Sequence, residues 1–189
     1  MATTFLDVDP QSLTTALNQV DAINFSNFYR TTSTTGVAPG ATGADNVLAV
    51  YSLPANTFGT TLGQTQELAI QCSGVFGANG NTKRVRIIWN ATTAVVGSTV
   101  TGGTVISDTG AVTTNGGGFN LNAAVIRAGS NSQVCVNEGA IAGSTHVGTT
   151  APAAATATET GAILIAVTGN ATTTASDIKL NYFQVDGMF

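Results

Sequence analysis

Apolar and polar residues alternate over two neighbouring segments in the middle of the chain, Glu67 to Phe76 and Lys83 to Trp89. A period of two is typical of a β-strand that buries one of its faces. The connection between the segments contains Asn79-Gly80, a dipeptide that supplies the positive φ of a tight reversal. We therefore predict a β-hairpin here, with the rest of the chain forming further strands around it.

The second strand of this hairpin has two different faces. One face begins with Lys83 and continues with three large apolar side chains, Val85, Ile87 and Trp89. The other face carries Arg84, Arg86 and Ile88. Half of the six Lys and Arg residues of the chain lie in this strand. We interpret them as charges in contact with solvent or at the rim of an interface, because three cations are too few for a nucleic-acid surface.

Further strands are expected wherever short apolar runs are bounded by Gly, Pro, Asn or Ser. They are Val47 to Ser52, Ala94 to Val100, Val105 to Ile106, Phe119 to Ala128, Ser132 to Asn137, Ala162 to Thr168 and Asp177 to Val185. Gly129-Ser130-Asn131 joins two of these strands into a second hairpin. The long segment Glu138 to Glu159 is interpreted as an exposed loop with at most one short strand, around His146.

The last strand is apolar on both faces. Ile178, Leu180 and Tyr182 are expected on one face, and Phe183 and Val185 on the other. A strand of this kind is central in its sheet or lies at an interface.

Eight or nine strands with turn signals between them predict an all-β domain over residues 46–189. We predict an antiparallel β-sandwich and favour a jelly roll among its forms.

Residues 1–45 differ from this pattern and are expected to form a short helix, an arm and a linker. Asp9-Pro10 is typical of a helix start, and apolar residues follow it at helical spacing. Two interpretations stand side by side: a helix docked on its own domain, or an arm that docks on a neighbouring subunit. The residues that would make this contact are Phe5, Leu6, Leu13, Leu17, Val20, Ile23, Phe25, Phe28 and Tyr29.

The composition adds a prediction about partners. Only 8 % of the residues are charged and the formal net charge is −4, whereas about 25 % is usual for soluble domains. A surface so poor in charge has little electrostatic help in staying monomeric. We expect other protein subunits to cover much of it. The negative net charge argues against nucleic acid as a partner. We also expect no membrane partner, because no apolar run reaches about 18 residues.

The chain contains few residues that carry chemistry, and we predict no enzyme, cofactor or metal. His146 is the only histidine, and no nucleophile motif accompanies it. The ten carboxylates are widely spaced, so a glycosidase pair would have to form in space. Cys72 and Cys135 form a disulfide if their strands are neighbours, or remain two buried free thiols, which is the interpretation we favour.

The aromatic residues have two interpretations. Trp89, Tyr51, Tyr182 and the Phe side chains would form a sugar-binding platform if they were exposed together. Most of them lie at strand positions that face a core, so packing is the interpretation we favour.

Five segments resemble the β-rich structural proteins of tailed-bacteriophage virions and of prophages. They are YSLPANT (51–57), GVFGANGNTK (74–83), NAAVIRAG (122–129), VTGN (167–170) and DIKLNYF (177–183). The resemblance covers residues 47–185 and implies a jelly-roll-like subunit of the virion, without catalytic residues. It favours a head decoration or cement protein, and a tail or fibre protein that binds a host-surface glycan is the alternative.

In the decoration role the protein would be a homotrimer bound to the major capsid protein, with Phe5 to Arg30 making much of the contact. The expected place is the capsid surface of a virion assembled in the host cytoplasm, since Met1 to Thr4 starts no signal peptide.

Overall fold

The structure is a computed structural model that describes residues 26–32, 43–60, 64–113, 115–141, 145–146, 153–171 and 177–188. All regular secondary structure in these ranges is β, as the sequence predicted, and no helix occurs in them. The strands are β1 (Ser26–Thr32), β2 (Asn46–Leu53), β3 (Glu67–Phe76), β4 (Lys83–Trp89), β5 (Thr104–Asp108), β6 (Gly118–Gly129), β7 (Ser132–Ile141), β8 (Thr145–His146), β9 (Ala153–Ala154), β10 (Ile163–Ala171) and β11 (Ile178–Met188).

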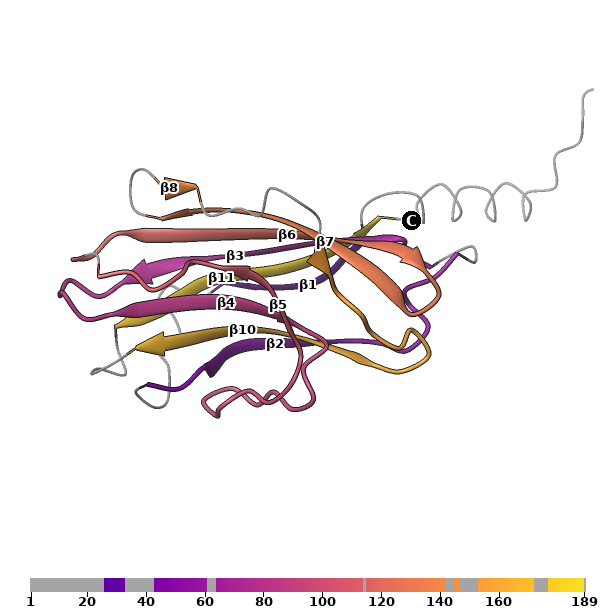
Figure 1. Cartoon of the computed structure of the whole chain (residues 1–189), viewed down its shortest axis with the longest axis horizontal. Helices are drawn as coiled ribbons and strands as arrows, with labels where there is room; N and C mark the ends of the chain where they lie inside the picture. Colours follow the sequence, from indigo (N-terminus) through magenta and orange to yellow (C-terminus); the bar gives the residue numbers. More distant parts are fainter. Residues whose placement is uncertain are drawn as a thin grey trace, which may run out of the picture.

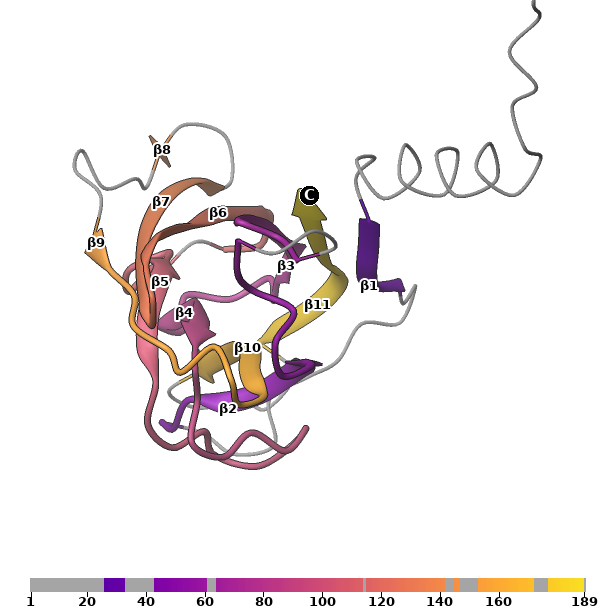
Figure 2. The same ribbon diagram turned by 90° about the vertical axis from the view of Figure 1, so that its right-hand side faces the viewer.

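The strands form two antiparallel sheets (Figure 1). Sheet A has the order β1-β11-β3-β6-β7-β8, with β9 also paired to β7, and sheet B has the order β2-β10-β4-β5. Figure 2 shows the same arrangement from the side. The pairing is nested: β1 pairs with β11, β2 with β10, β3 with β6 and β4 with β5, and successive pairs alternate between the sheets. This arrangement is compatible with a β-sandwich.

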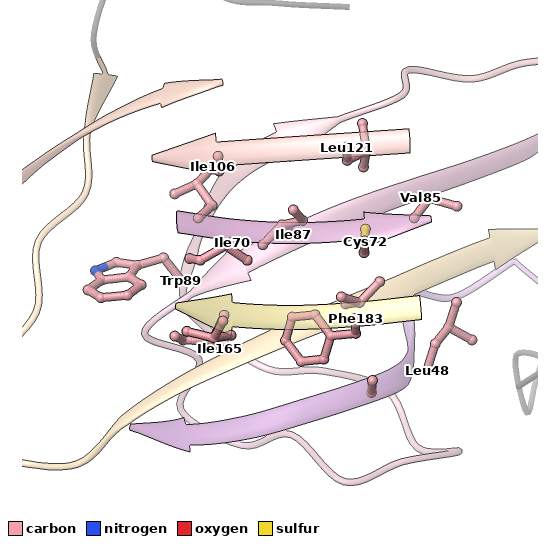
Figure 3. Close-up of a cluster of buried hydrophobic side chains, with 14 of the residues drawn as sticks. Leu48, Ile70, Cys72, Val85, Ile87, Trp89, Ile106, Leu121, Ile165 and Phe183 are labelled. Carbon is pink, nitrogen blue, oxygen red and sulfur yellow. The ribbon is translucent and has the colours of Figure 1, made fainter. Parts of the chain in front are cut away.

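The core lies between the two sheets and receives side chains from both. Ile70, Cys72, Leu121 and Phe183 extend from sheet A toward Val85, Ile87, Trp89 and Ile165 of sheet B (Figure 3). Each of these eight residues is at most 1 % exposed. Burial of one such large apolar side chain contributes about 1.5 to 3 kcal/mol, so this shared layer holds the two sheets together.

The predicted hairpin between β3 and β4 is wrong, although the bounds of both strands are as predicted. β3 pairs with β11 and β6 in sheet A, and β4 pairs with β10 and β5 in sheet B. The Asn-Gly connection is therefore a corner at which the chain changes sheet. The physical reason is that each strand has one apolar face, and the two apolar faces can bury each other only from opposite sheets.

The two faces of β4 are as predicted. Val85, Ile87 and Trp89 are fully buried on the core side, together with Lys83. The predicted solvent or rim position is therefore wrong for Lys83, because its ammonium donates to the backbone oxygens of Asn79 and Asn81 instead of to water. Arg84 and Arg86 lie on the other side and are partly exposed.

β11 is an inner strand of sheet A, as its apolar composition predicted, but the predicted division of its faces is wrong. Ile178 and Leu180 are buried in the same core as Phe183 and Val185. A register shift between Leu180 and Tyr182 exchanges the faces, because a β-bulge adds one residue to the strand. Tyr182 therefore lies on the outer face of sheet A.

The segment Ala94 to Val100 is a loop rather than the predicted strand. It belongs to the β4–β5 connection, which covers the outer face of sheet B at the bottom of Figure 1. Gly97 N–H donates to Val47 O at 2.9 Å, and Val47 N–H donates to Ser98 O at 2.9 Å. This loop shields an apolar cluster that includes Val47, Ile88 and Ala166.

The second predicted hairpin is confirmed as β6 and β7, with Asn131 at a φ of 53° in its turn. The short strand around His146 is present as β8, paired to β7. The prediction of an exposed loop with at most one short strand over Glu138 to Glu159 is otherwise wrong: β7 extends to Ile141, β9 also pairs with β7, and Ala155 and Ala157 are buried in the core. The small side chains of this segment gave no local sign of burial, which depends on contact with β7. At the N-terminal side, β1 pairs with β11, and the predicted helix lies outside the described residues.

Candidate functional site

Trp89 is a core residue and cannot be part of an exposed sugar platform. Its side chain is fully buried, and Phe58 packs edge-on against it with ring centroids 6.2 Å apart. Tyr51 is partly buried against the same core. Tyr182 lies on the outer face of sheet A and is partly exposed, away from Trp89 and Tyr51.

The cations of β4 are held by carboxylates beside sheet B. Arg84 contacts both carboxylate oxygens of Asp108, its Nε at 2.8 and 3.0 Å. Arg86 bridges Asp108 and Asp45. Burial alone would raise the pKa of Asp108, but the hydrogen bond and charge of Arg84, with help from Gly110 N–H and Arg86, lower it. Asp108 is therefore a structural anion and not a proton donor near neutral pH.

A second network fixes the segment before β10 to the β6–β7 hairpin. Arg127 Nε and Nη2 donate to the two carboxylate oxygens of Glu159 at 2.9 and 3.1 Å. The buried Gln133 donates to Glu159 Oε1 at 3.0 Å and accepts from Ala157 N–H at 2.7 Å. These groups satisfy one another, and such closed polar networks specify structure.

Both cysteines are free and fully buried, which confirms the favoured interpretation. Cys72 lies in β3 and Cys135 in β7, and β6 separates the two strands. Burial raises the pKa of Cys72 to about 12 and that of Cys135 to about 11. Neither thiol is activated for nucleophilic chemistry.

Most residues expected to contact a neighbour lie outside the described part of the chain: Phe5, Leu6, Leu13, Leu17, Val20, Ile23 and Phe25. Phe28 and Tyr29 lie in β1, at the edge of sheet A. The structure therefore brings the last two residues of this set to a sheet edge.

The outer face of sheet A contains a hollow of about 560 Å³ over its four inner strands. Its floor is made of small side chains, Ala69 of β3 and Ala124 of β6, which are partners in the strand register. Polar side chains surround them: Gln71, Asn122, Glu138 and Asp186. We call this hollow the sheet A groove. Its volume lies within the range of about 300 to 1,000 Å³ of small-molecule sites.

The register aligns three polar residues of the groove in one row across sheet A. Gln71 of β3 pairs with Asn122 of β6, and Asn122 pairs with Glu138 of β7. Gln184 of β11 continues this row beside the groove, opposite Gln71. Gln71 Nε2 donates to Asn122 Oδ1 at 2.8 Å, and Gln184 Nε2 donates to Asp186. These hydrogen bonds fix the orientation of the amides before any ligand arrives.

The two carboxylates of the groove lie on β11 and β7, three strand spacings apart. That separation is about 14 Å between the strands, beyond the range of roughly 5 to 9.5 Å of a glycosidase pair. Within the described ranges no three His, Cys, Asp or Glu side chains come together as a metal site. The polar side chains at the groove are those of Gln71, Asn122, Glu138 and Asp186, all of which can form hydrogen bonds.

The sequence pattern alone did not predict this groove, although part of the signal is present in it. Gln71 and Asn122 occupy outward positions of strands whose inward positions were correctly assigned to the core. Four strands contribute the lining, and only the pairing of these strands brings them together.

In comparisons with known proteins, no protein-family model and no curated protein matches this chain. In the part of the chain that the structure describes, no helix has the length and apolarity needed to cross a membrane.

Proposed function

We propose that the two-sheet domain is a jelly roll. The nested pairing of β1 with β11, β2 with β10, β3 with β6 and β4 with β5 supports this proposal, since a jelly roll consists of eight strands in two interleaved Greek keys. In this view β7, β8 and β9 are additions between the sixth and seventh strands of the motif.

We propose that the protein is a virion structural protein that decorates a phage capsid as a homotrimer and stabilises it by bridging capsid subunits. The sequence resemblance over residues 47–185 supports the virion assignment. Jelly rolls occur in viral capsids and also in lectins and cupins, so the fold alone does not assign the function.

The observation that carries the assembly proposal is the distribution of cations. Among the described side chains, Arg84, Arg86 and Arg127 are in ion pairs, and Lys83 is fully buried. Lys179 is the one described Lys or Arg side chain that is exposed. Most of the described cations are used in ion pairs within the domain, so few of them repel a second subunit, which favours close packing of many copies.

The test is attachment to undecorated shells of the cognate major capsid protein. A variant lacking residues 2–25 should lose at least about tenfold in affinity, equivalent to about 1.4 kcal/mol, and should keep its β-type circular dichroism. The deletion ends before β1 because Ser26–Thr32 belongs to sheet A. Co-sedimentation measures attachment, and light scattering measures whether the free protein is a trimer.

A matched control changes exposed apolar residues elsewhere. Val95 and Val96 are 64 % and 50 % exposed at the tip of the β4–β5 loop, and their replacement by Ser should leave attachment unchanged. Undiminished attachment of the deletion variant would show that the N-terminal segment does not make the contact. Failure of the full-length protein to bind shells would overturn the decoration role.

A second candidate function is recognition of a host-surface glycan from a tail or fibre. The sheet A groove favours it, because amides and carboxylates surround small apolar side chains there. Lectin domains are another common use of the jelly roll.

A further inference from the structure

We propose that the sheet A groove binds a neutral saccharide, and that Gln71 and Asn122 are its central contacts. The proposal deepens the second candidate function and rests on it. It names a site and a ligand class, and it is independent of capsid attachment.

The first argument concerns the groups that are left for a ligand. In the hydrogen bond between Gln71 and Asn122, Gln71 uses its NH₂ group and Asn122 uses its oxygen. The acceptor Gln71 Oε1 and the donor Asn122 Nδ2 take no part in this bond. They lie on adjacent strands, about 4.8 Å apart in backbone spacing. A neighbouring acceptor and donor match a pair of hydroxyl groups, each of which both donates and accepts.

The second argument concerns charge. Glu138 and Asp186 lie at opposite sides of the groove, and none of the lining residues that the structure describes is Lys, Arg or His. Arg30 stands opposite Gln184 in the β1–β11 register, one strand beyond the lining strands. Carboxylates among the described lining residues disfavour a phosphate, sulfate or carboxylate ligand. A sugar without acidic groups meets no such repulsion and can donate a hydroxyl hydrogen to Asp186.

The third argument concerns shape. Ala69 and Ala124 form a low apolar floor, and the exposed Val136 continues it on β7. An apolar floor bordered by polar side chains suits a pyranose, which has C–H groups on its ring faces and hydroxyls at its edge.

A peptide is a poorer match. The strands under the groove are β11, β3, β6 and β7, and the inner ones are paired on both sides. An extended peptide binds a sheet by adding to a free edge, and the groove lies on a face where no backbone groups are free.

The experiment is a glycan array probed with the full-length protein in its native oligomeric state. The array carries neutral oligosaccharides together with their sialylated, sulfated and phosphorylated counterparts. Binding should be confined to neutral glycans, and a neutral hit is then titrated by calorimetry. Gln71→Ala and Asn122→Ala should each weaken the binding of that hit at least about tenfold. Ala69→Leu, which fills the floor with an outward side chain, should abolish it.

Gln66→Ala is the matched control, since Gln66 is exposed immediately before β3 and does not line the groove; its affinity should equal that of the unchanged protein. If neutral glycans bind but their affinity is unchanged in all three groove variants, the protein recognises glycans at a site other than the sheet A groove. Hits restricted to anionic glycans would overturn the ligand class. An array without hits would overturn both the saccharide site and the second candidate function. It would not bear on capsid attachment, which co-sedimentation with shells tests separately.

Discussion

At the scale of single residues, burial decides what the polar and reactive side chains do. Cys72 and Cys135 are fully buried, and Cys135 donates to Ile106 O at 3.4 Å. A thiolate would lose its hydration there, and this loss raises the pKa of both groups. The thiols therefore serve as small core residues.

The first prediction concerns pH. Unfolded thiols ionise near pH 8.5 to 9, whereas the folded protein retains both protons until about pH 11 to 12. The unfolded state thus binds fewer protons above pH 9, and the free energy of unfolding falls as pH rises. We expect the free energy of unfolding to fall by about 3 kcal/mol between pH 8 and pH 10. Each thiol contributes about 1.4 kcal/mol per pH unit, and it does so mainly above pH 9, where the unfolded thiol is ionised. Urea denaturation at a series of pH values measures it.

The variant Cys72→Ala/Cys135→Ala is the control for this effect. It should be less stable at pH 8 and should lack most of the decline between pH 8 and pH 10. Burial also raises the pKa of Tyr51, but that phenol contributes above pH 10. Equal declines in the two proteins would contradict the assignment to the cysteines.

At the scale of elements, the β4–β5 loop shows how irregular backbone can be as closely packed as a strand. Gly103 has a φ of 86°, and a Cβ at this position would lie 2.6 Å from Ile88 Cγ2 and 2.9 Å from Trp89 O. Gly97 has a similar φ of 84° and no atom within 4 Å of such a Cβ. A side chain at Gly97 would therefore add backbone strain alone, whereas a side chain at Gly103 would add both backbone strain and crowding.

The second prediction uses this pair. Gly97→Ala should reduce the free energy of unfolding by about 1 kcal/mol, since alanine is strained at positive φ. Gly103→Ala should cost about 3 kcal/mol, because crowding against the end of β4 adds about 1 to 3 kcal/mol to the same strain. Chemical denaturation of both variants measures the difference. Equal costs would mean that the loop does not pack on sheet B as closely as described.

At the scale of the whole molecule, the corner between β3 and β4 joins the two sheets. Asp177, just before β11, is 1 % exposed and accepts hydrogen bonds from Asn79 Nδ2 at 2.6 Å and Asn81 Nδ2 at 2.8 Å. Lys83 Nζ donates to Asn79 O at 2.7 Å and to Asn81 O at 3.0 Å. The corner is therefore fixed by side chains from both sheets.

The third prediction is that Asp177→Ala lowers the free energy of unfolding by about 3 kcal/mol. Two hydrogen bonds to a buried carboxylate are lost, and such bonds contribute about 1.5 to 3 kcal/mol each before relaxation. Lys179→Ala, at an exposed position two residues away, should change it by less than about 0.5 kcal/mol. Hydrogen exchange should also become faster in residues 77–82. Unchanged exchange there would show that Asp177 does not hold the corner.

The sequence by itself determined the strand content of this protein, the bounds of β3 and β4 and the core faces of most strands. The reason is that a period of two is local: Leu68, Ile70 and Cys72 identify a buried face whichever partner covers it. The burial of both cysteines and of Trp89 follows from the same local pattern.

Only the tertiary structure decided which strands pair. Asn79-Gly80 has the local signal of a hairpin but turns the chain between sheets, because the contacts that select β11 and β10 as partners come from about 100 residues further along. The bulge after Leu180, and with it the outward position of Tyr182, depends on pairing with β3 in the same way. The sheet A groove exists only once β11, β3, β6 and β7 lie side by side, since its lining residues come from all four strands.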